Sequence, residues 1–283
     1  MVDHGSFGAA ARKLNRAVSV VSYGVSNLEA QLGVKLFERE GTRKPRLTPA
    51  GKAVLTEVRA VARGVEDLRA TVRGLLQGLE AELSVAVDVM LPPDRLGRVL
   101  RAFQQEFPTV ALRLHVEALG AVAVAVLEGA ADLGLSGPLT GATDPLEITD
   151  AGAVMLVPVA APDHPLARTQ PLRPGVAREH IQLVLSDRSP RTAGLDFGVQ
   201  SPSTWRLADL GAKHQLLREG IGWGNMPLPL IKDDLQTGAL LRLALPEEPE
   251  VTYRFAVINR RDRKLGPAAS WLRERFVRGS DEM

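Results

Sequence analysis

Two amphipathic helical patterns joined by a short polar break open the chain, and few folds accommodate such a pair. Ser6 can cap the first helix, which we expect over residues 6–14, and Gly33 can end the second in a left-handed conformation. Apolar residues recur at steps of three or four: Phe7, Ala10, Ala11 and Leu14 in the first helix, and Val18, Val21, Val25, Leu28 and Leu32 in the second. The pair predicts a helix-turn-helix, with Asn15 and Arg16 at the turn.

The outward face of the second helix is small, polar and almost uncharged. It carries Ser19, Ser22, Tyr23, Ser26 and Asn27, and only Glu29 departs from this pattern. Side chains contact base edges through hydrogen bonds and methyl groups at close range, whereas phosphate repels acidic groups. We therefore predict that Ser19, Ser22 and Tyr23 lie at base edges in a major groove of DNA.

A short basic loop follows the second helix. Four cations surround Gly41 and Pro45: Arg39, Arg43, Lys44 and Arg46. This loop predicts a wing whose cations, together with Arg16, contact phosphates or enter the minor groove, and a solvated turn is the alternative. Residues 1–50 contain eight Lys or Arg and four Asp or Glu, while residues 51–283 contain 27 and 29. The basic balance therefore belongs to the proposed DNA-binding part.

Residues 54–79 repeat apolar side chains at alternating steps of four and three. The positions are Val54, Val58, Val61, Val65, Leu68, Val72, Leu75 and Leu79. Such a period favours a helix that pairs with a second copy of the chain, and an amphipathic helix in a globular core is the alternative. Gly64, Gly74 and Gly78 weaken the helix, so burial between two copies would supply its stability. Two paired DNA-binding parts predict an approximately palindromic site.

From residue 83 onward, strand-like apolar runs alternate with helical stretches. We expect strands at 83–89, 110–116, 133–135, 154–161, 181–185 and 251–258, and helices at 94–106, 121–129, 207–219 and 266–277. This order predicts an α/β fold.

Composition and motifs argue against export and catalysis. The chain contains no Cys, and no apolar run approaches the roughly 20 residues that span a bilayer. Its five His residues are scattered, Asn225 replaces the last glycine of a dinucleotide motif after Gly220, and Pro138 replaces the last glycine of a nucleophile elbow around Ser136. We expect a cytoplasmic protein that is not an enzyme, does not contact membranes and has no metal site or cofactor.

Many of these residues match the N-terminal signature of LysR-type transcriptional regulators. The matching residues are Gly5-Ser6-Phe7, Ala10-Ala11, Leu14, Ser22, Leu28-Glu29, Leu32-Gly33-Val34, Leu36-Phe37-Glu38-Arg39 and Leu47-Thr48-Pro49-Ala50-Gly51. The chain departs from the family at Ala17-Val18-Ser19-Val20, where Ser-Gln-Pro-Ala is usual. Family members also have a further helix, of which Val2-Asp3-His4 looks like the tail. We therefore expect a late start or a truncated chain, which would expose apolar surface on the two remaining helices and weaken the domain.

The resemblance extends through the α/β part. The residues that carry it are Phe103, Phe107-Pro108, Gly129, Asp132-Leu133, Pro162-Asp163-His164-Pro165-Leu166, the expected turn Gly220-Ile221-Gly222-Trp223-Gly224-Asn225-Met226-Pro227, Asp234-Leu235 and Gly238. It implies a winged helix-turn-helix over residues 1–48, a linker and dimerisation helix over 49–80, and an effector-binding domain over 83–283. That domain is similar to type 2 periplasmic binding proteins, with lobe one at 83–155 and 251–283, lobe two at 156–250, and a ligand cleft between them.

The resemblance also implies which loops contact the effector. In this chain the contacts would be Met90, Leu91, Ser136, Gly137, Ser203, Thr204 and Trp205. The loop at Met90 is apolar and has no fixed cation nearby, so an anion at the helix start near Pro92 and a less polar ligand both remain open. Trp205 and Trp223 either belong to the core or line the cleft.

These patterns predict a LysR-type regulator that binds double-stranded promoter DNA as a homodimer or homotetramer. A small-molecule effector would control the arrangement of the DNA-bound parts through its different affinity for each arrangement. The alternative is a solute-binding receptor of the periplasmic-binding-protein type, which would be a monomer without DNA affinity.

Overall fold

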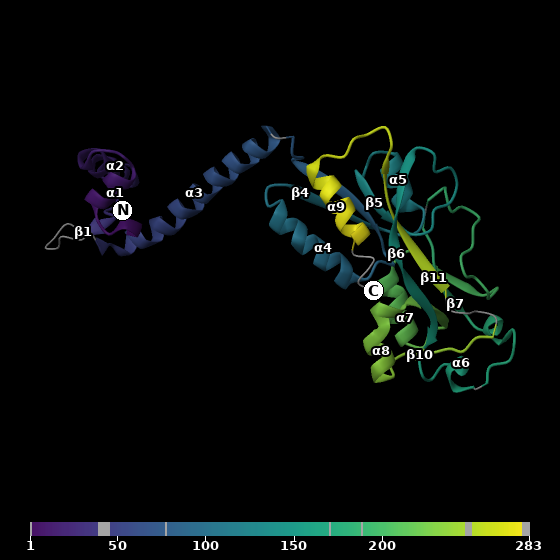
Figure 1. Ribbon diagram of the computed structural model, residues 1–283. Helices are drawn as coiled ribbons and strands as arrows, with labels where there is room; N and C mark the ends of the chain where they lie inside the picture. Colours follow the sequence, from purple (N-terminus) through teal and green to yellow (C-terminus); the bar gives the residue numbers. More distant parts are fainter. Residues whose placement is uncertain are drawn as a thin grey trace. The chain divides into compact units, whose positions relative to one another are not determined.

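The structure, a computed structural model, describes residues 2–38, 46–76, 78–169, 171–187, 189–246 and 251–278 (Figure 1). The chain divides into two compact units, Met1–Val72 and Arg73–Met283. No helix among the described residues is both long and apolar enough to cross a lipid bilayer.

The first unit contains the helix-turn-helix. Its elements are the short 3-10 helix η1 (Val2–His4), α1 (Phe7–Lys13), α2 (Val18–Leu32), β1 (Phe37–Glu38), β2 (Arg46–Leu47) and most of α3 (Pro49–Leu76). The Oγ of Ser6 accepts a hydrogen bond from Ala9 N at 3.1 Å, and Gly33 ends α2 with a φ of 68°. Both predicted caps are therefore confirmed.

Burial at the ends of the two helices differs from the prediction. Leu14, Val18 and Leu32 are 62%, 50% and 46% exposed, although their spacing predicted a core position. Leu14 is the residue that follows α1, and Val18 and Leu32 are the first and last residues of α2. Because end positions lie beyond the region where two short helices pack, helical spacing alone overestimates their burial.

Thr48 joins the start of α3 to the segment between α2 and β1. Its Oγ1 donates to the carbonyl of Lys35 at 2.6 Å and accepts from Gly51 N at 2.9 Å. A Cβ on Gly51 would lie 2.1 Å from the carbonyl oxygen of Leu36, so only glycine allows this approach. These contacts give the Leu-Thr-Pro-Ala-Gly motif a structural role.

The predicted heptad positions follow α3 as far as Leu75. Six of them are between 43% and 68% exposed: Val58, Val61, Val65, Leu68, Val72 and Leu75. The stripe is therefore not packed into the core of either unit, and its pairing with a second copy stays a prediction. The predicted helical repeat is wrong at Leu79, because α3 ends at Leu76 and the Leu79 side chain packs on the hydrophobic core of the second unit.

Within the described residues, the second unit contains one mixed sheet of nine strands. The strands are β3 (Glu82–Asp88), β4 (Ala111–Glu117), β5 (Leu133–Ser136), β6 (Leu146–Ala160), β7 (Gln182–Leu185), β8 (Thr204–Leu207), β9 (Trp223–Pro227), β10 (Leu241–Arg242) and β11 (Val251–Arg260). Their order is β4-β3-β5-β11-β6-β9-β7-β8, with β10 beside β6. Strands β4, β3 and β5 are parallel, as are β9, β7 and β8, and the antiparallel pair β11 and β6 joins the two groups. The sheet thus connects two α/β lobes.

Helices cover both faces of the sheet in the first lobe. The helices of the second unit are α4 (Pro93–Glu106), α5 (Ala121–Leu127), α6 (Pro165–Arg168), η2 (Val176–Glu179), α7 (Leu210–Arg218), η3 (Leu228–Ile231), α8 (Lys232–Thr237) and α9 (Pro267–Arg278). Val85 and Val87 of β3 pack in the cluster that α4 and α9 complete, whereas Ala86 packs with α5. Helices α4 and α9 lie side by side (Figure 1).

Every strand and helix predicted for the second unit is present, which confirms the α/β prediction. The largest difference in length concerns the strand predicted at 154–161, which begins at Leu146. Gly220 and Gly222 form a turn as expected, but the five residues Trp223–Pro227 form β9. The turn prediction is wrong for those residues because they pair with β6.

Candidate functional sites

The outward face of α2 presents the side chains predicted to contact bases. Ser19, Ser22 and Tyr23 are exposed, and Tyr23 is 73% exposed. Arg16 is exposed in the turn before α2, and Arg46 is exposed on β2. Arg39, Arg43 and Lys44 lie outside the described residues. The first unit thus combines small, exposed polar groups on α2 with exposed cations before and after α2 in sequence, as DNA recognition requires.

Glu29 faces inward from α2, which sequence analysis did not foresee. It is 4% exposed, and its Oε1 accepts hydrogen bonds from Leu36 N at 2.8 Å and Phe37 N at 3.2 Å. Burial raises the pKa of Glu29, but these N–H groups and the Lys35 ammonium, 3.4 Å from Oε2, bring the pKa below its ordinary value. Glu29 therefore attaches α2 to the start of β1.

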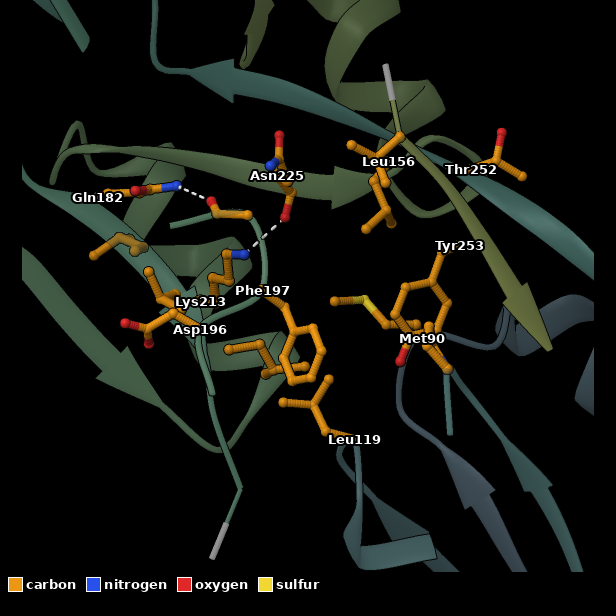
Figure 2. Close-up of a pocket in the computed structure, with 16 residues that line it drawn as sticks. Met90, Leu119, Leu156, Gln182, Asp196, Phe197, Lys213, Asn225, Thr252 and Tyr253 are labelled. Atoms are coloured by element: carbon orange, nitrogen blue, oxygen red, sulfur yellow. Dashed lines mark hydrogen bonds between the residues drawn. The ribbon is translucent and has the colours of Figure 1, made fainter. Parts of the chain in front are cut away.

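A cavity of about 320 Å³ lies between the two lobes of the second unit (Figure 2). The first lobe contributes Met90 and Leu119 to its lining, and the second lobe contributes Gln182, Phe197, Lys213 and Asn225. The strands that join the lobes contribute Leu156, Thr252 and Tyr253. Cavities of this size accept small organic molecules.

Lys213 is buried at the second-lobe side of the cavity. It lies on α7, is 3% exposed, and its Nζ donates to the carbonyl of Asn225 at 2.7 Å. Gln182 shapes the neighbouring loop, because its amide donates to the carbonyl of Gly198 at 2.7 Å and accepts from Ser201 N at 3.0 Å. The second lobe therefore contributes a positioned cation to the cavity wall.

Asp88, the last residue of β3, connects the end of β5 and the joining strand β11 beside the cavity. Its carboxylate, 1% exposed, accepts hydrogen bonds from Met90 N at 2.8 Å, Gly137 N at 3.3 Å and the Tyr253 hydroxyl at 2.8 Å. Burial raises the pKa of Asp88 from 3.8 to about 6, although these donors lower it in part. Burial and the nearby Asp88 carboxylate raise the pKa of Tyr253.

Replacing Asp88 with Asn is expected to change how stability depends on pH. The folded-state pKa lies above the unfolded value of 3.8, so the contribution of Asp88 to the stability of wild type falls as pH rises from about 4 to about 6. Because Asn does not titrate, the unfolding free energy of D88N should rise by about 3 kcal/mol relative to that of wild type over this window. Urea unfolding of both proteins across the window measures the shift.

Asp94→Asn is the matched control, because Asp94 is an exposed carboxylate on α4 of the same lobe. D94N should follow the wild-type pH dependence closely. A D88N protein whose unfolding free energy stays parallel to that of wild type between these pH values would contradict the assigned role of Asp88.

The structure distributes the seven predicted effector residues over several places. Met90 lines the cavity, and Gly137 donates its N–H to Asp88. Leu91 and Ser136 are buried, and the Ser136 hydroxyl has no hydrogen-bond partner among the described residues. Ser203 and Thr204, like the 47% exposed Trp205, belong to the outer edge at β8. The effector roles of all seven remain predictions.

Trp223 belongs to the core. It is fully buried, and its Nε1 donates to the carbonyl of Ala177 at 3.0 Å. Sequence analysis missed Leu119, Phe197 and Lys213 in the cavity wall. For Lys213 a signal existed, because it occupies the same helical face as the buried leucines at positions 210 and 217.

Family comparisons match nearly the whole chain. The family described as LysR substrate binding domain matches residues 76–280, and the family described as bacterial regulatory helix-turn-helix protein, lysR family, matches residues 1–52. The transcriptional regulator YeeY of Escherichia coli is 29% identical over 98% of this chain and 89% of its own length. The regulator PunR of Escherichia coli is 29% identical over 96% of this chain and 87% of its own length.

Solved structures show the same fold. Full-length LysG from Corynebacterium glutamicum with bound effector Arg superimposes with a TM-score of 0.57 and 20% identity, covering 99% of this chain and 94% of LysG. The effector-binding domain of QuiR in complex with shikimate gives a TM-score of 0.58 and 14% identity, covering 72% of this chain and 98% of that domain. Together with the two matched domains, these results establish that the chain belongs to the LysR family of transcriptional regulators.

Proposed function

We propose that this regulator binds promoter DNA in the cytoplasm as a homodimer, or as a pair of dimers, and that a small molecule in the cavity between the lobes controls it. The observation that carries the proposal is the exposed, uncharged face of α2 with cations on both sides of it in sequence. In this arrangement Ser19, Ser22 and Tyr23 contact bases, while Arg16 and Arg46 contact phosphates.

The exposed stripe on α3 supports dimerisation. Its six apolar side chains recur at heptad spacing, and each is at least 43% exposed in the single chain. From position 58 to position 75 the stripe extends about 25 Å at 1.5 Å per residue, and pairing with a second copy removes it from water. A dimer brings two copies of α2 to successive major grooves.

The cavity in the second unit supports control by a small molecule. It contacts both lobes and the strands between them, so a bound molecule has contacts that depend on how the lobes are arranged. LysG with Arg and QuiR with shikimate, which share the fold, each bind a small organic molecule. A ligand in this cavity changes DNA binding only if its affinity differs between two arrangements of the lobes.

A double replacement of Arg16 and Arg46 by Ala tests the DNA-binding surface. Because phosphate contacts release counterions, we expect R16A/R46A to bind all DNA sequences more weakly and to reduce the slope of log affinity against log salt by about one to two. Mobility-shift titrations at several salt concentrations measure both quantities.

Arg101→Ala is the control, because Arg101 is an exposed cation on α4 of the second unit. Its removal should leave affinity and salt slope unchanged. An R16A/R46A protein with wild-type affinity at every salt concentration would refute the proposed surface. A wild-type protein that is monomeric and indifferent to DNA would instead favour the solute-binding receptor.

A further inference from the structure

The cavity between the lobes has an apolar end and a polar end (Figure 2). Met90, Leu119 and the ring of Tyr253 form the apolar end, and Phe197 faces them from the second lobe. Lys213 and the other polar side chains of the second lobe lie at the opposite end. A molecule that fills the cavity therefore needs an apolar body and one polar group.

The backbone donors at the first-lobe end are already engaged. Met90 N and Gly137 N donate to the carboxylate of Asp88, and Leu91 N donates to its carbonyl at 3.0 Å. The next two residues, Pro92 and Pro93, have no N–H group. The Asp88 carboxylate thus occupies the donors that a ligand anion would need, and its own charge repels such an anion. This end accepts the apolar body.

The second-lobe end carries positive charge. Lys213 supplies the only cationic side chain among the described lining residues, and Asp196 supplies the only carboxylate there. Asp196 lies at the rim, where its Oδ1 is 2.7 Å from Nη2 of Arg206 on β8. A buried ammonium attracts an anion more strongly than an exposed one, because less water screens the interaction. This end therefore accepts an anionic group.

We propose that the effector is an amphipathic organic acid, with its carboxylate bound at Lys213 on the second lobe and its apolar body packed against Met90, Leu119 and Phe197. This inference rests on the proposed effector role of the cavity and assigns the chemical class of its ligand. One molecule then contacts the two lobes through different chemistry, charge on the second and apolar surface on the first.

Two matched series of compounds test the assignment with the full-length protein. The first is phenylacetate, phenylacetamide and phenethylamine, and the second is hexanoate, hexanamide and hexylamine. Each series keeps one carbon skeleton and changes only the polar group. We expect an acid from at least one series to raise the Tm and to bind about ten- to hundredfold more tightly than its amide, and the amine not to bind.

Two variants of Lys213 assign the preference to its charge. Lys213→Met keeps an unbranched side chain that is one atom shorter and removes the ammonium, so affinity for the acid should fall about ten- to hundredfold while affinity for the amide is retained. Lys213→Arg keeps a cation and should keep the preference for the acid. Because both variants replace the same buried side chain, a difference between them reports charge rather than loss of packing.

Three results would overturn the proposal: no stabilisation by either acid, tighter binding of an amide or amine than of its acid, or an undiminished preference for the acid in a folded K213M. Mobility shifts on the same samples separate this inference from the proposed function. A protein that binds DNA and prefers the amide refutes only the ligand class. A protein that prefers the acid and does not bind DNA supports the ligand class and refutes the proposed DNA-binding function.

Discussion

Replacing Val61 and Leu68 with Asp is expected to convert the protein into a monomer. These side chains are 68% and 63% exposed in the single chain and occupy consecutive positions of the same kind in the heptad repeat of α3. In a dimer paired through this stripe, V61D/L68D would bury four carboxylates in the interface, and the cost of removing them from water prevents pairing. Operator affinity should fall at least about a hundredfold, because the two copies of α2 no longer bind as one linked unit.

Light scattering measures the mass of the V61D/L68D protein, and mobility shifts measure its affinity for DNA. The matched control is T56D/R63D, which places two carboxylates at exposed positions on the opposite face of the same helix. This control should remain dimeric. If V61D/L68D keeps the mass of a dimer, α3 is not the dimerisation element.

Replacing Glu29 with Ala is expected to destabilise the DNA-binding unit by about 3 kcal/mol, because the buried N–H group of Leu36 and the part-buried N–H group of Phe37 lose their acceptor. The pKa of folded Glu29 lies below its ordinary value of 4.5. The contribution of Glu29 to stability is therefore complete at pH values above its ordinary pKa, and it is lost as pH falls through the lowered pKa of the folded state. Thermal unfolding of the full-length protein, followed at neutral pH, should show an earlier first transition in E29A.

Glu29→Gln distinguishes the hydrogen bonds from the charge. Both backbone donors bind the same carboxylate oxygen, Oε1, so the Gln carbonyl can accept both of them. The lost ion pair involves Lys35, whose side chain is 65% exposed, and contributes little. E29Q should therefore unfold within about 1 kcal/mol of wild type. An E29A protein as stable as E29Q would show that the two hydrogen bonds do not matter.

The sequence predicted correctly those features that depend only on neighbouring residues. The caps at Ser6 and Gly33 depend on local backbone geometry, and the strands and helices of the second unit follow local apolar runs. Periodicity failed where burial depends on where an element ends. Leu14 lies just beyond its helix, and Leu79 lies beyond the end of α3 and packs in a different unit.

The sites were harder to predict than the fold. The inward position of Glu29 depends on where the chain returns after α2, which the spacing of α2 does not reveal. The cavity combines Met90, Lys213 and Tyr253, which are far apart in sequence and meet only through the order of the strands. The local signal for this cavity was Lys213 itself, a lysine on the apolar face of a helix.

The paired strands β6 and β11 limit how the two lobes of the second unit can move. Since both strands continue from one lobe into the other as a hydrogen-bonded ribbon, any change in the angle between the lobes must bend the ribbon itself. Its weakest point is the irregular register between Arg254 and Ala256, next to Tyr253 in the cavity wall. Flexure concentrated there would couple ligand occupancy to a small rotation, whereas wide clamshell opening would require this ladder to break.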